Sequence, residues 1–321
     1  MRVHVYSIPL KNTFRGLNVR EGVLVEHGGR WAEWSPFSEY DDEIASRWLR
    51  ATLSQLTDRR EPLRASVPVN VTVPEVGPER AAEIVAGSGC KTAKVKVAGT
   101  SSLEDDVTRV KAVRRELGAE GRVRVDANGS WSVPEALRAL EKLGEVGLEY
   151  AEQPCASVEE LARLRKELAK SGLTVPIAAD ESIRRAEDPL WAAALDAADV
   201  VVLKVQPLGG VEKVLELAEK LAPRKVVISS ALETSVGIHA SLRAACLLPS
   251  LDAACGINTV RLFTGDVVAE PLIAKCGELT LGPCPEPSQE LLAEYAAPEP
   301  RARWWRERLE RCREIVSEEA A

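Results

Sequence analysis

Five charged residues recur along the chain at one repeating interval, and each stands at the end of a short apolar run. They are Lys96, Asp126, Glu152, Asp180 and Lys204, spaced roughly 23 to 30 residues apart, which is the length of one strand plus one helix. In a parallel β/α barrel every strand points the same way, so the carboxyl ends of the strands form one rim, where such barrels place their active sites. The spacing therefore predicts three carboxylates and two lysines around one mouth.

The three carboxylates predict a metal site. An acid at one strand end is usually a helix cap or an ion-pair partner, but three on successive strands repel one another unless a cation lies between them. Oxygen ligands suit Mg²⁺, with Mn²⁺ as a substitute, and the three histidines are far apart in the sequence, which disfavours a histidine-ligated site. In the motif "ADES" either Asp180 or Glu181 could be the third ligand beside Asp126 and Glu152. Asp180 is favoured because it lies nearer the expected strand end.

Two lysines share one strand. Lys94 and Lys96 are separated by one residue and therefore point to the same face. Lysine is rarely buried, so two lysines that point into a packed barrel indicate a chemical role; the alternative is that both point outward and the valines between them fill the interior. The charge of Lys94 is expected to lower the pKa of Lys96 and to suit it as a base. Lys204 is expected to face this pair across the mouth, unless it is a solvated strand-end lysine.

Weaker candidates lie near the same rim. Arg124 shares a face with Asp126 by the same alternation and is a weaker candidate for substrate binding; it would either orient an acid or form an ion pair. The loops at 229–237 and 256–259 contain small residues and free backbone N–H groups, with Ser229, Ser230 and Gly256 among them. Such loops suit a substrate carboxylate, although plain turns have the same composition.

The order of strand and helix patterns predicts the fold class, an α/β protein with a TIM-type (β/α) barrel. The expected strands are 67–73, 92–97, 122–126, 148–152, 176–180, 199–204, 225–230 and 254–258. They are rich in Val, Ile and Ala, as in strands buried on both sides. Between them lie helix patterns, two of which begin with the capping sequences "SVPE" and "SVEE". An open doubly wound sheet would need a Gly-rich phosphate loop after its first strand, and "VTVPEVGPER" is not one.

The two ends of the chain do not follow this rhythm. Residues 1–64 show three strand patterns and then a helix pattern with an acidic first turn, which predicts an α+β capping domain. Residues 65–285 form the expected barrel domain. Residues 286–321 are polar and predict a C-terminal helical segment that packs on the cap or the barrel and completes the cap, with Trp304 and Trp305 as its anchors.

Composition bounds the environment and the partners. The chain has 321 residues, enough for one barrel and a smaller domain, and its net charge of −7 leaves no basic excess to neutralise nucleic acid or an anionic membrane. It shows no signal peptide and no apolar run long enough to span a bilayer. The seven cysteines are odd in number and form no CxxC pair, as expected for free thiols in the cytoplasm. We expect a small-molecule carboxylate as the partner, and the sequence leaves the oligomeric state open, a monomer included.

The motifs resemble those of the enolase superfamily, in its muconate-lactonising subgroup. The resemblance is carried by K-x-K on the second barrel strand, by D-A-N, E-Q-P and D-E-S on the next three and by a lysine on the sixth, and it covers nearly the whole chain. Within the subgroup, "LKVQPLGG" and "SSALETSVGI" are most similar to the o-succinylbenzoate synthase family in its actinobacterial form. The cap is shorter than in most of the subgroup. Dipeptide epimerases carry Asp-x-Asp where this chain reads "CGINTVRLFTGD", and histidine-based members need a His–Asp pair that this chain lacks.

The resemblance implies a carbon–oxygen lyase. Its reaction would be the syn-dehydration of 2-succinyl-6-hydroxy-2,4-cyclohexadiene-1-carboxylate to 2-succinylbenzoate in menaquinone biosynthesis, through an enediolate, with Mg²⁺ and no organic cofactor. Lys96 would remove the α-proton and return a proton to the departing hydroxyl. Lys204 would stabilise the intermediate from the other face, and Lys94 would position the substrate carboxylate. Further substrate contacts are expected from Asn128 and from Phe14 and Arg15 in a cap loop over the mouth.

Other functions remain open at this point. A racemase of N-acyl (N-succinyl) amino acids would use Lys96 and Lys204 as two bases on opposite faces of the substrate. A Schiff-base aldolase would use Lys204 alone, and three metal carboxylates disfavour it. A barrel that binds only a metal or a partner would have no use for the paired lysines.

Overall fold

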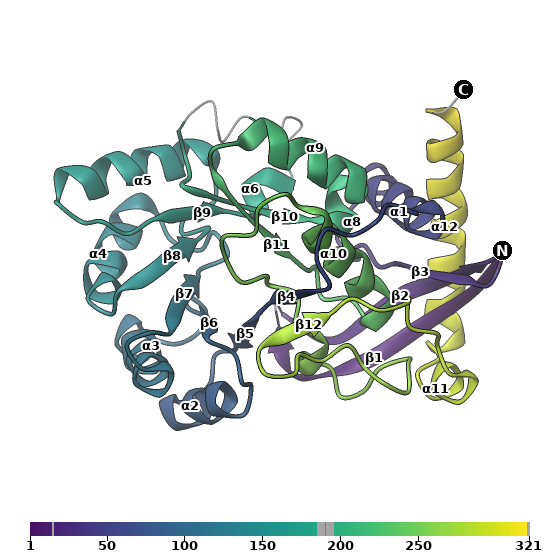
Figure 1. The fold of residues 1–321 in the computed structure, drawn as a ribbon, viewed down its shortest axis with the longest axis horizontal. Helices are drawn as coiled ribbons and strands as arrows, with labels where there is room; N and C mark the ends of the chain where they lie inside the picture. The colour runs from purple at the N-terminus through teal and green to yellow at the C-terminus, as the bar shows by residue number, and fades with distance from the viewer. Residues whose placement is uncertain (15, 185–189, 191–195, 320–321) are drawn as a thin grey trace.

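The N-terminal part of the protein is a small antiparallel sheet covered by a helix. The computed structural model describes residues 1–14, 16–184, 190 and 196–319 (Figure 1). The first elements are β1 (Arg2–Phe14), β2 (Leu17–His27), β3 (Arg30–Trp34) and α1 (Asp42–Thr57), and the sheet order is β1-β2-β3. The helix begins where Asp41 accepts a hydrogen bond from the backbone N–H of Ile44 at 2.8 Å. This part has its own core, which includes the buried Trp34 and Trp48.

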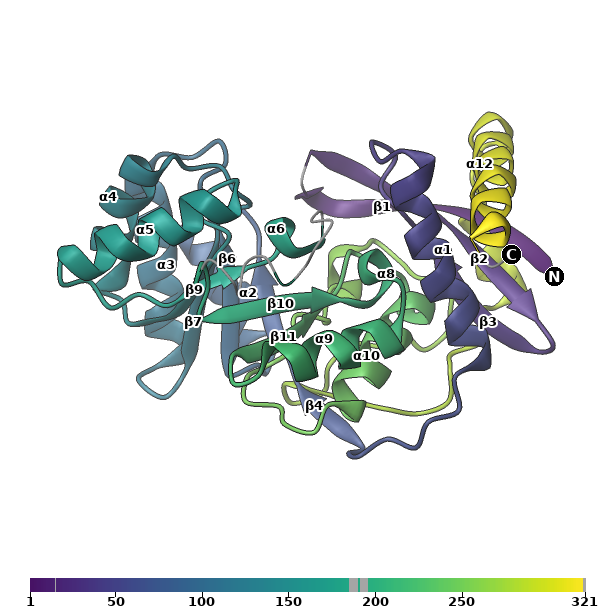
Figure 2. The same ribbon diagram turned by 90° about the horizontal axis from the view of Figure 1, so that it is seen from above.

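The C-terminal segment folds back onto this first sheet. It forms two helices, α11 (Gln289–Glu294) and α12 (Glu299–Glu318), and Pro298 lies at the start of the second. Trp305 is buried against Trp34, with 5.5 Å between the ring centroids in an edge-to-face contact. Trp304 is only half-buried and lies under the guanidinium of Arg301. The tail therefore completes the core of the cap, and Figure 2 shows α1 between α12 and the barrel.

The central domain is a curled parallel sheet with helices on its outer side (Figure 1). In the part of the chain that the structure describes, seven strands follow one another in the order β11-β10-β9-β8-β7-β6-β5, and every neighbouring pair is parallel. They are β5 (Asn70–Val73), β6 (Thr92–Lys96), β7 (Arg122–Asp126), β8 (Leu148–Glu152), β9 (Ile177–Ala179), β10 (Val200–Lys204) and β11 (Lys225–Ser229). The expected (β/α) barrel fold is confirmed.

The described helices between and after these strands are α2 (Pro78–Ala86), α3 (Leu103–Leu117), α4 (Val133–Gly144), α5 (Val158–Lys170), α6 (Glu181–Arg184), α8 (Val205–Leu208), α9 (Val211–Leu221), α10 (Ser235–Leu247) and the short 3-10 helix η1 (Val260–Leu262). Ser132 and Ser157 form the two expected capping boxes, with Glu135 and Glu160. The valine and leucine faces of the helices pack on the strands and form the main core.

The first and eighth expected barrel strands differ from the sequence-based prediction. The stretch 67–73 is divided into β4 (Ser66–Pro68), which pairs with β12 (Glu278–Thr280) in a separate antiparallel sheet, and β5. The stretch 254–258 forms no strand, because only Cys255 and Gly256 make ladder contacts, to Val69 and Ser229. The two residues still link the edge strands, because Asn70 of β5 donates its N–H to the carbonyl of Cys255 and Gly256 donates its N–H to the carbonyl of Ile228 in β11. Among the described residues, no helix is long and apolar enough to cross a membrane.

Candidate active site

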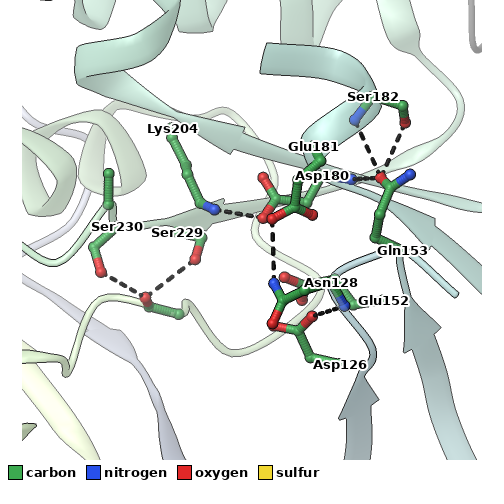
Figure 3. Close-up of polar contacts among 12 residues, drawn as sticks. Asp126, Asn128, Glu152, Gln153, Asp180, Glu181, Ser182, Lys204, Ser229 and Ser230 are labelled. Carbon is green, nitrogen blue, oxygen red and sulfur yellow. Dashed lines mark hydrogen bonds and ion pairs between the residues drawn. The ribbon is translucent and has the colours of Figure 1, made fainter. Parts of the chain in front are cut away.

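The parallel register of the strands gathers the predicted residues at one rim. Lys96, Asp126, Glu152 and Lys204 are the last residues of their strands, and Asp180 directly follows β9. Lys96 lies opposite Asp126 in the ladder, and Asp126 lies opposite Glu152. Lys96, Asp126, Asp180 and Lys204 line one pocket, and Glu152 joins the same cluster through a hydrogen bond from Lys94. Figure 3 shows the three carboxylates near one another, with Lys204 beside Asp180. The spacing in the sequence therefore predicted a real cluster.

Ammonium groups alternate with carboxylates in this cluster. Lys94 Nζ lies 2.7 Å from Glu152 Oε1 and 3.1 Å from Asp126 Oδ2. Lys96 Nζ donates to Asp126 Oδ2 at 2.6 Å, and Lys204 donates to Asp180 Oδ2. All three carboxyl groups are 1% exposed. Both lysines of β6 thus point into the barrel, and the alternative in which they point outward is excluded.

Burial and neighbouring charge shift the pKa values of these groups. Burial opposes the charge on Lys94, but Glu152 and Asp126 outweigh it and raise the pKa of Lys94 well above its usual value. Burial is the largest effect on the pKa of Lys96 and lowers it, and the positive charge of Lys94 lowers it further. The negative charge of Asp126 acts in the opposite direction but does not cancel them. The direction for Lys96 is the one expected from the sequence.

The carboxyl groups shift in opposite directions. Burial opposes ionisation of Asp126, but Lys96 and Lys94 overcome it and lower the pKa of Asp126. Burial raises the pKa of Glu152 to about 7, and the negative charges of Asp126 and Asp180 add to this effect against Lys94. Carboxylates in this cluster therefore still repel one another, despite the lysines between them.

The donor chemistry of the cluster fits a hard divalent cation. Its acidic ligands offer only oxygen atoms, they are buried, and the raised pKa of Glu152 shows that positive charge there would be favourable. As they stand, no three Asp, Glu, His or Cys side chains within the described part of the chain are arranged to hold a metal ion. The lysine ammoniums supply the positive charge in this arrangement, so a cation would have to displace at least some of them.

Asn128 and Glu181 extend the cluster. Asn128 accepts a hydrogen bond from Lys96 at 2.7 Å and donates one to Glu181 Oε1 at 3.2 Å (Figure 3). Both residues line the pocket, and so does Asp180. The structure therefore brings both acids of the "ADES" motif to the mouth and leaves the choice of ligand between them open.

Gln153 is a site residue that the sequence analysis did not single out. Its Oε1 accepts three hydrogen bonds, from the backbone N–H groups of Asp180 at 2.9 Å and Ser182 at 3.2 Å and from the Ser182 hydroxyl at 3.0 Å (Figure 3). Gln153 itself has a left-handed backbone, with φ 40°. It ties the end of β8 to the turn that carries Asp180. Its place in the "EQP" motif beside Glu152 was the available signal.

Small residues form another side of the pocket, as expected. Ser229 and Ser230 both donate to the carbonyl of Gly256 at 3.2 Å, and all three line the pocket. A Cβ at Gly256 would lie 2.6 Å from Ser229 Oγ, so a side chain at this position would force Ser229 to move.

Arg124 does not reach the pocket, contrary to the expected substrate contact. Its side chain is fully buried in the barrel interior, where it donates to Glu149 at 2.6 Å and to Asn70 at 3.1 Å and stacks on the ring of Tyr150. Of the two interpretations left open for Arg124, the ion pair is the one observed. Strand alternation predicts the face on which a side chain lies but not its depth in the barrel, so Arg124 lies below the mouth while Asp126 lies at it.

The cap supplies two aromatic residues to the mouth. Phe14 is the last residue of β1 rather than part of a loop; it lines the pocket as expected, and its ring centroid lies 4.9 Å from Lys96 Nζ. Arg15, also expected to contact the substrate, lies outside the described residues. Phe37 lines the pocket as well. It was missed because nothing local distinguishes its "WSPF" segment from an ordinary strand end.

Comparisons with known proteins show what the chain is similar to. Residues 78–286 match the model of the family described as Enolase C-terminal domain-like, and residues 5–55 match the one described as Enolase N-terminal domain-like. The o-succinylbenzoate synthase of Thermobifida fusca is 53% identical over 281 residues, which is 87% of each chain. The o-succinylbenzoate synthase of Mycolicibacterium smegmatis is 48% identical over 321 residues, covering 98% of this chain and 96% of the relative.

Solved structures show the same fold at lower sequence identity. Muconate lactonizing enzyme from Pseudomonas fluorescens aligns with a TM-score of 0.77 at 22% identity, over 92% of this chain and 98% of that one. N-succinyl Arg/Lys racemase from Bacillus cereus aligns with a TM-score of 0.76 at 20% identity, over 92% and 97% of the two chains.

Proposed function

The chain belongs to the o-succinylbenzoate synthase family of the enolase superfamily, and we propose that it is a carbon–oxygen lyase of menaquinone biosynthesis. Its reaction would be the dehydration of 2-succinyl-6-hydroxy-2,4-cyclohexadiene-1-carboxylate to 2-succinylbenzoate. The observation that carries the proposal is the alignment with named synthases over nearly the whole chain. The mouth of the barrel supports it, because it holds acids at the carboxyl ends of β7, β8 and β9, between lysines on β6 and β10.

The metal in this proposal is Mg²⁺, with Mn²⁺ as a substitute. Asp126, Glu152 and Asp180 would hold it, and Glu181 is the alternative third ligand. When bound, the cation supplies positive charge beside the substrate carboxylate, which stabilises the second negative charge of an enediolate. The support is the buried, oxygen-only donor set and the raised pKa of Glu152.

Lys96 would act first as base and then as acid. As a neutral amine it takes the α-proton, and the electrons of the broken C–H bond enter the enediolate. The C–O bond to the hydroxyl then breaks, and the ammonium of Lys96 gives its proton to the departing oxygen. One water leaves, the ring becomes aromatic, and Lys96 returns to the amine. Its lowered pKa supports this role.

Lys94 and Lys204 would serve as fixed positive charges. The raised pKa of Lys94 keeps it an ammonium, suited to orienting the substrate carboxylate beside Asp126. Lys204 would stabilise the intermediate from the opposite face, through its charge and a cation–π contact as the ring aromatises. Phe14 would cover the substrate from the cap, and Asn128, Ser229, Ser230 and Gly256 would contact it, since all of these line the pocket.

The cytoplasm is the proposed compartment. All seven cysteines, which lie in the described part of the chain, are free in the structure, and this supports a reducing environment.

The test is an ultraviolet assay with the cyclohexadiene substrate. We expect the purified protein to form 2-succinylbenzoate with Mg²⁺ or Mn²⁺, to lose activity with a chelator and to recover it when metal is returned. Asp126→Asn and Glu152→Gln should weaken metal binding while the far-UV circular dichroism is kept. Full activity after exhaustive metal removal would contradict the metal proposal, and no turnover by the metal-loaded parent would contradict the function.

A racemase of N-succinyl amino acids is the second candidate. The observation that favours it is the placement of Lys96 and Lys204 on strands on two sides of the mouth, which suits proton transfer on both faces of a substrate. Incubation with an N-succinyl amino acid in D₂O distinguishes the two. Racemisation with α-deuterium exchange, without dehydratase turnover, would favour the racemase.

A further inference from the structure

Arg20 joins the cap to the barrel behind the pocket. It belongs to β2, its side chain is 3% exposed, and its guanidinium contacts both domains. Nε donates to the carbonyl of Leu232 at 2.9 Å, and Nη2 lies 3.3 Å from the carbonyl of Ala231. Nη2 also donates to the carbonyl of Ser35 in the cap, and Cζ lies 4.5 Å from the centroid of the Phe37 ring. One buried cation therefore holds main chain of the cap and of the β11–α10 loop together.

Three of the residues that Arg20 contacts line the pocket. These are Phe37, Ala231 and Leu232. Together with Phe14 they are the apolar side chains of a pocket whose other lining residues are mostly charged or polar, among them lysines, carboxylates, serines and threonines. Phe37 belongs to the cap, whereas Ala231 and Leu232 belong to the barrel. Their positions relative to one another therefore depend on how the cap is held against the barrel.

Leu232 adds a second, independent observation. Its backbone lies in the left-handed region, with φ 66°, which a non-glycine residue adopts only where its surroundings hold it there. The hydrogen bond from Arg20 Nε ends on the carbonyl of this same residue. On the other side of the loop, Glu33 of the cap accepts hydrogen bonds from the backbone N–H groups of Thr234 at 3.1 Å and Gly237 at 3.2 Å, at the start of α10. The loop is thus fixed from the cap at both ends.

We propose that Arg20 is a positioning residue that assembles Phe37, Ala231 and Leu232 into one apolar wall, and that this wall binds the non-reacting, carbon-rich part of the substrate. The identity of that substrate rests on the proposed function. Arg20 touches no reacting group, because the lysines and carboxylates that carry the chemistry stand on β6 to β10. Loss of the wall should therefore weaken substrate and transition state alike, which raises KM and leaves kcat nearly unchanged.

The experiment compares Arg20→Ala and Arg20→Lys with the matched control Arg64→Ala. Arg64 also donates to main-chain carbonyls, those of Ala245 at 2.9 Å and Leu248 at 2.6 Å, but these belong to the C-terminal end of α10, away from the pocket. In the Mg²⁺-loaded protein, Arg20→Ala should raise KM and the Kd of 2-succinylbenzoate about tenfold, or about 1.4 kcal/mol, with kcat changed less than about threefold. Arg20→Lys keeps the charge but not the planar fork, so it should fall in between.

Amide hydrogen exchange of residues 229–237 provides a readout that needs no substrate. Exchange there should speed up in both Arg20 variants and not in Arg64→Ala. If Arg20→Ala does not fold, KM and hydrogen exchange are measured on Arg20→Lys instead, and these two measurements decide whether Arg20 positions the wall. Unchanged exchange in a folded Arg20 variant overturns the proposal, and so does an equal rise of KM in Arg64→Ala. If the parent shows no turnover, the proposed function fails, and the exchange measurement alone decides the role of Arg20.

Discussion

Glu233 is a buried acid whose replacement should stabilise the protein, but only at high pH. It lies in the loop before α10 and is 0% exposed. Its Oε2 accepts a hydrogen bond from the backbone N–H of Ala231 at 2.8 Å, while Oε1 has no hydrogen-bond partner within the described residues. Burial raises the pKa of Glu233 to about 7, and the negative charge of Glu33 adds to this, against Arg20. Ionisation of Glu233 therefore destabilises the folded protein relative to the unfolded chain.

The sign of the pH effect follows from the two pKa values. Between pH 4.5, the usual value, and about 7, the unfolded chain has lost the Glu233 proton while the folded protein keeps it. The folded state then binds more protons, so the free energy of unfolding falls as pH rises through this window and the loss is complete above it. At about 1.4 kcal/mol per pH unit, this interval sets an upper bound on the order of 3 kcal/mol.

Glu233→Gln replaces the carboxyl by a neutral amide of the same shape. We expect the variant to match the parent near pH 5 and to exceed its free energy of unfolding by roughly 2–3 kcal/mol near pH 8. Urea unfolding of both proteins at a series of pH values measures the difference, in which other titrating groups cancel. Glu219→Gln, on the exposed face of α9, is the control and should give the same difference at every pH. A difference for Glu233→Gln that is constant with pH, or a parent that is the more stable at pH 8, would refute the reasoning.

Three further predictions concern the site and its support. Lys204→Arg should keep more dehydratase activity than Lys96→Arg, because arginine keeps the charge but is a poor base; if Lys96→Arg proved the more active in the ultraviolet assay, the two roles would have to be exchanged. Gln153→Ala removes the acceptor of three hydrogen bonds that fix the turn of Asp180, so the Mg²⁺ affinity measured by calorimetry should fall about 10- to 100-fold. Parent-like affinity would show that the turn holds without Gln153. Gly237→Ala would place a Cβ 2.6 Å from the Cβ of Glu233 and should cost about 1–3 kcal/mol in urea unfolding; an unchanged unfolding midpoint would mean that the first turn of α10 can shift freely.

The sequence predicted the barrel because its signals are local and periodic. One strand and one helix fill a nearly constant length of chain, and helix caps such as Ser132 and Ser157 mark the starts. Where pairing is not local, the prediction was less accurate. The eighth strand is reduced to bridges at Cys255 and Gly256, and part of the first pairs with β12, because a ladder depends on partners that lie far away in the chain.

The sequence by itself determined which charged residues share the mouth of the barrel. Parallel strands place their carboxyl ends at one rim, so position within a repeat fixes position in space for Lys96, Asp126, Glu152 and Lys204. Only the tertiary structure decided how deep a side chain lies and which distant segments meet. Arg124 lies below the mouth although it shares a face with Asp126. The contacts between cap residues and the β11–α10 loop leave no local pattern in the sequence. They depend on how the two domains pack against each other, and not on the spacing of strands and helices within either domain.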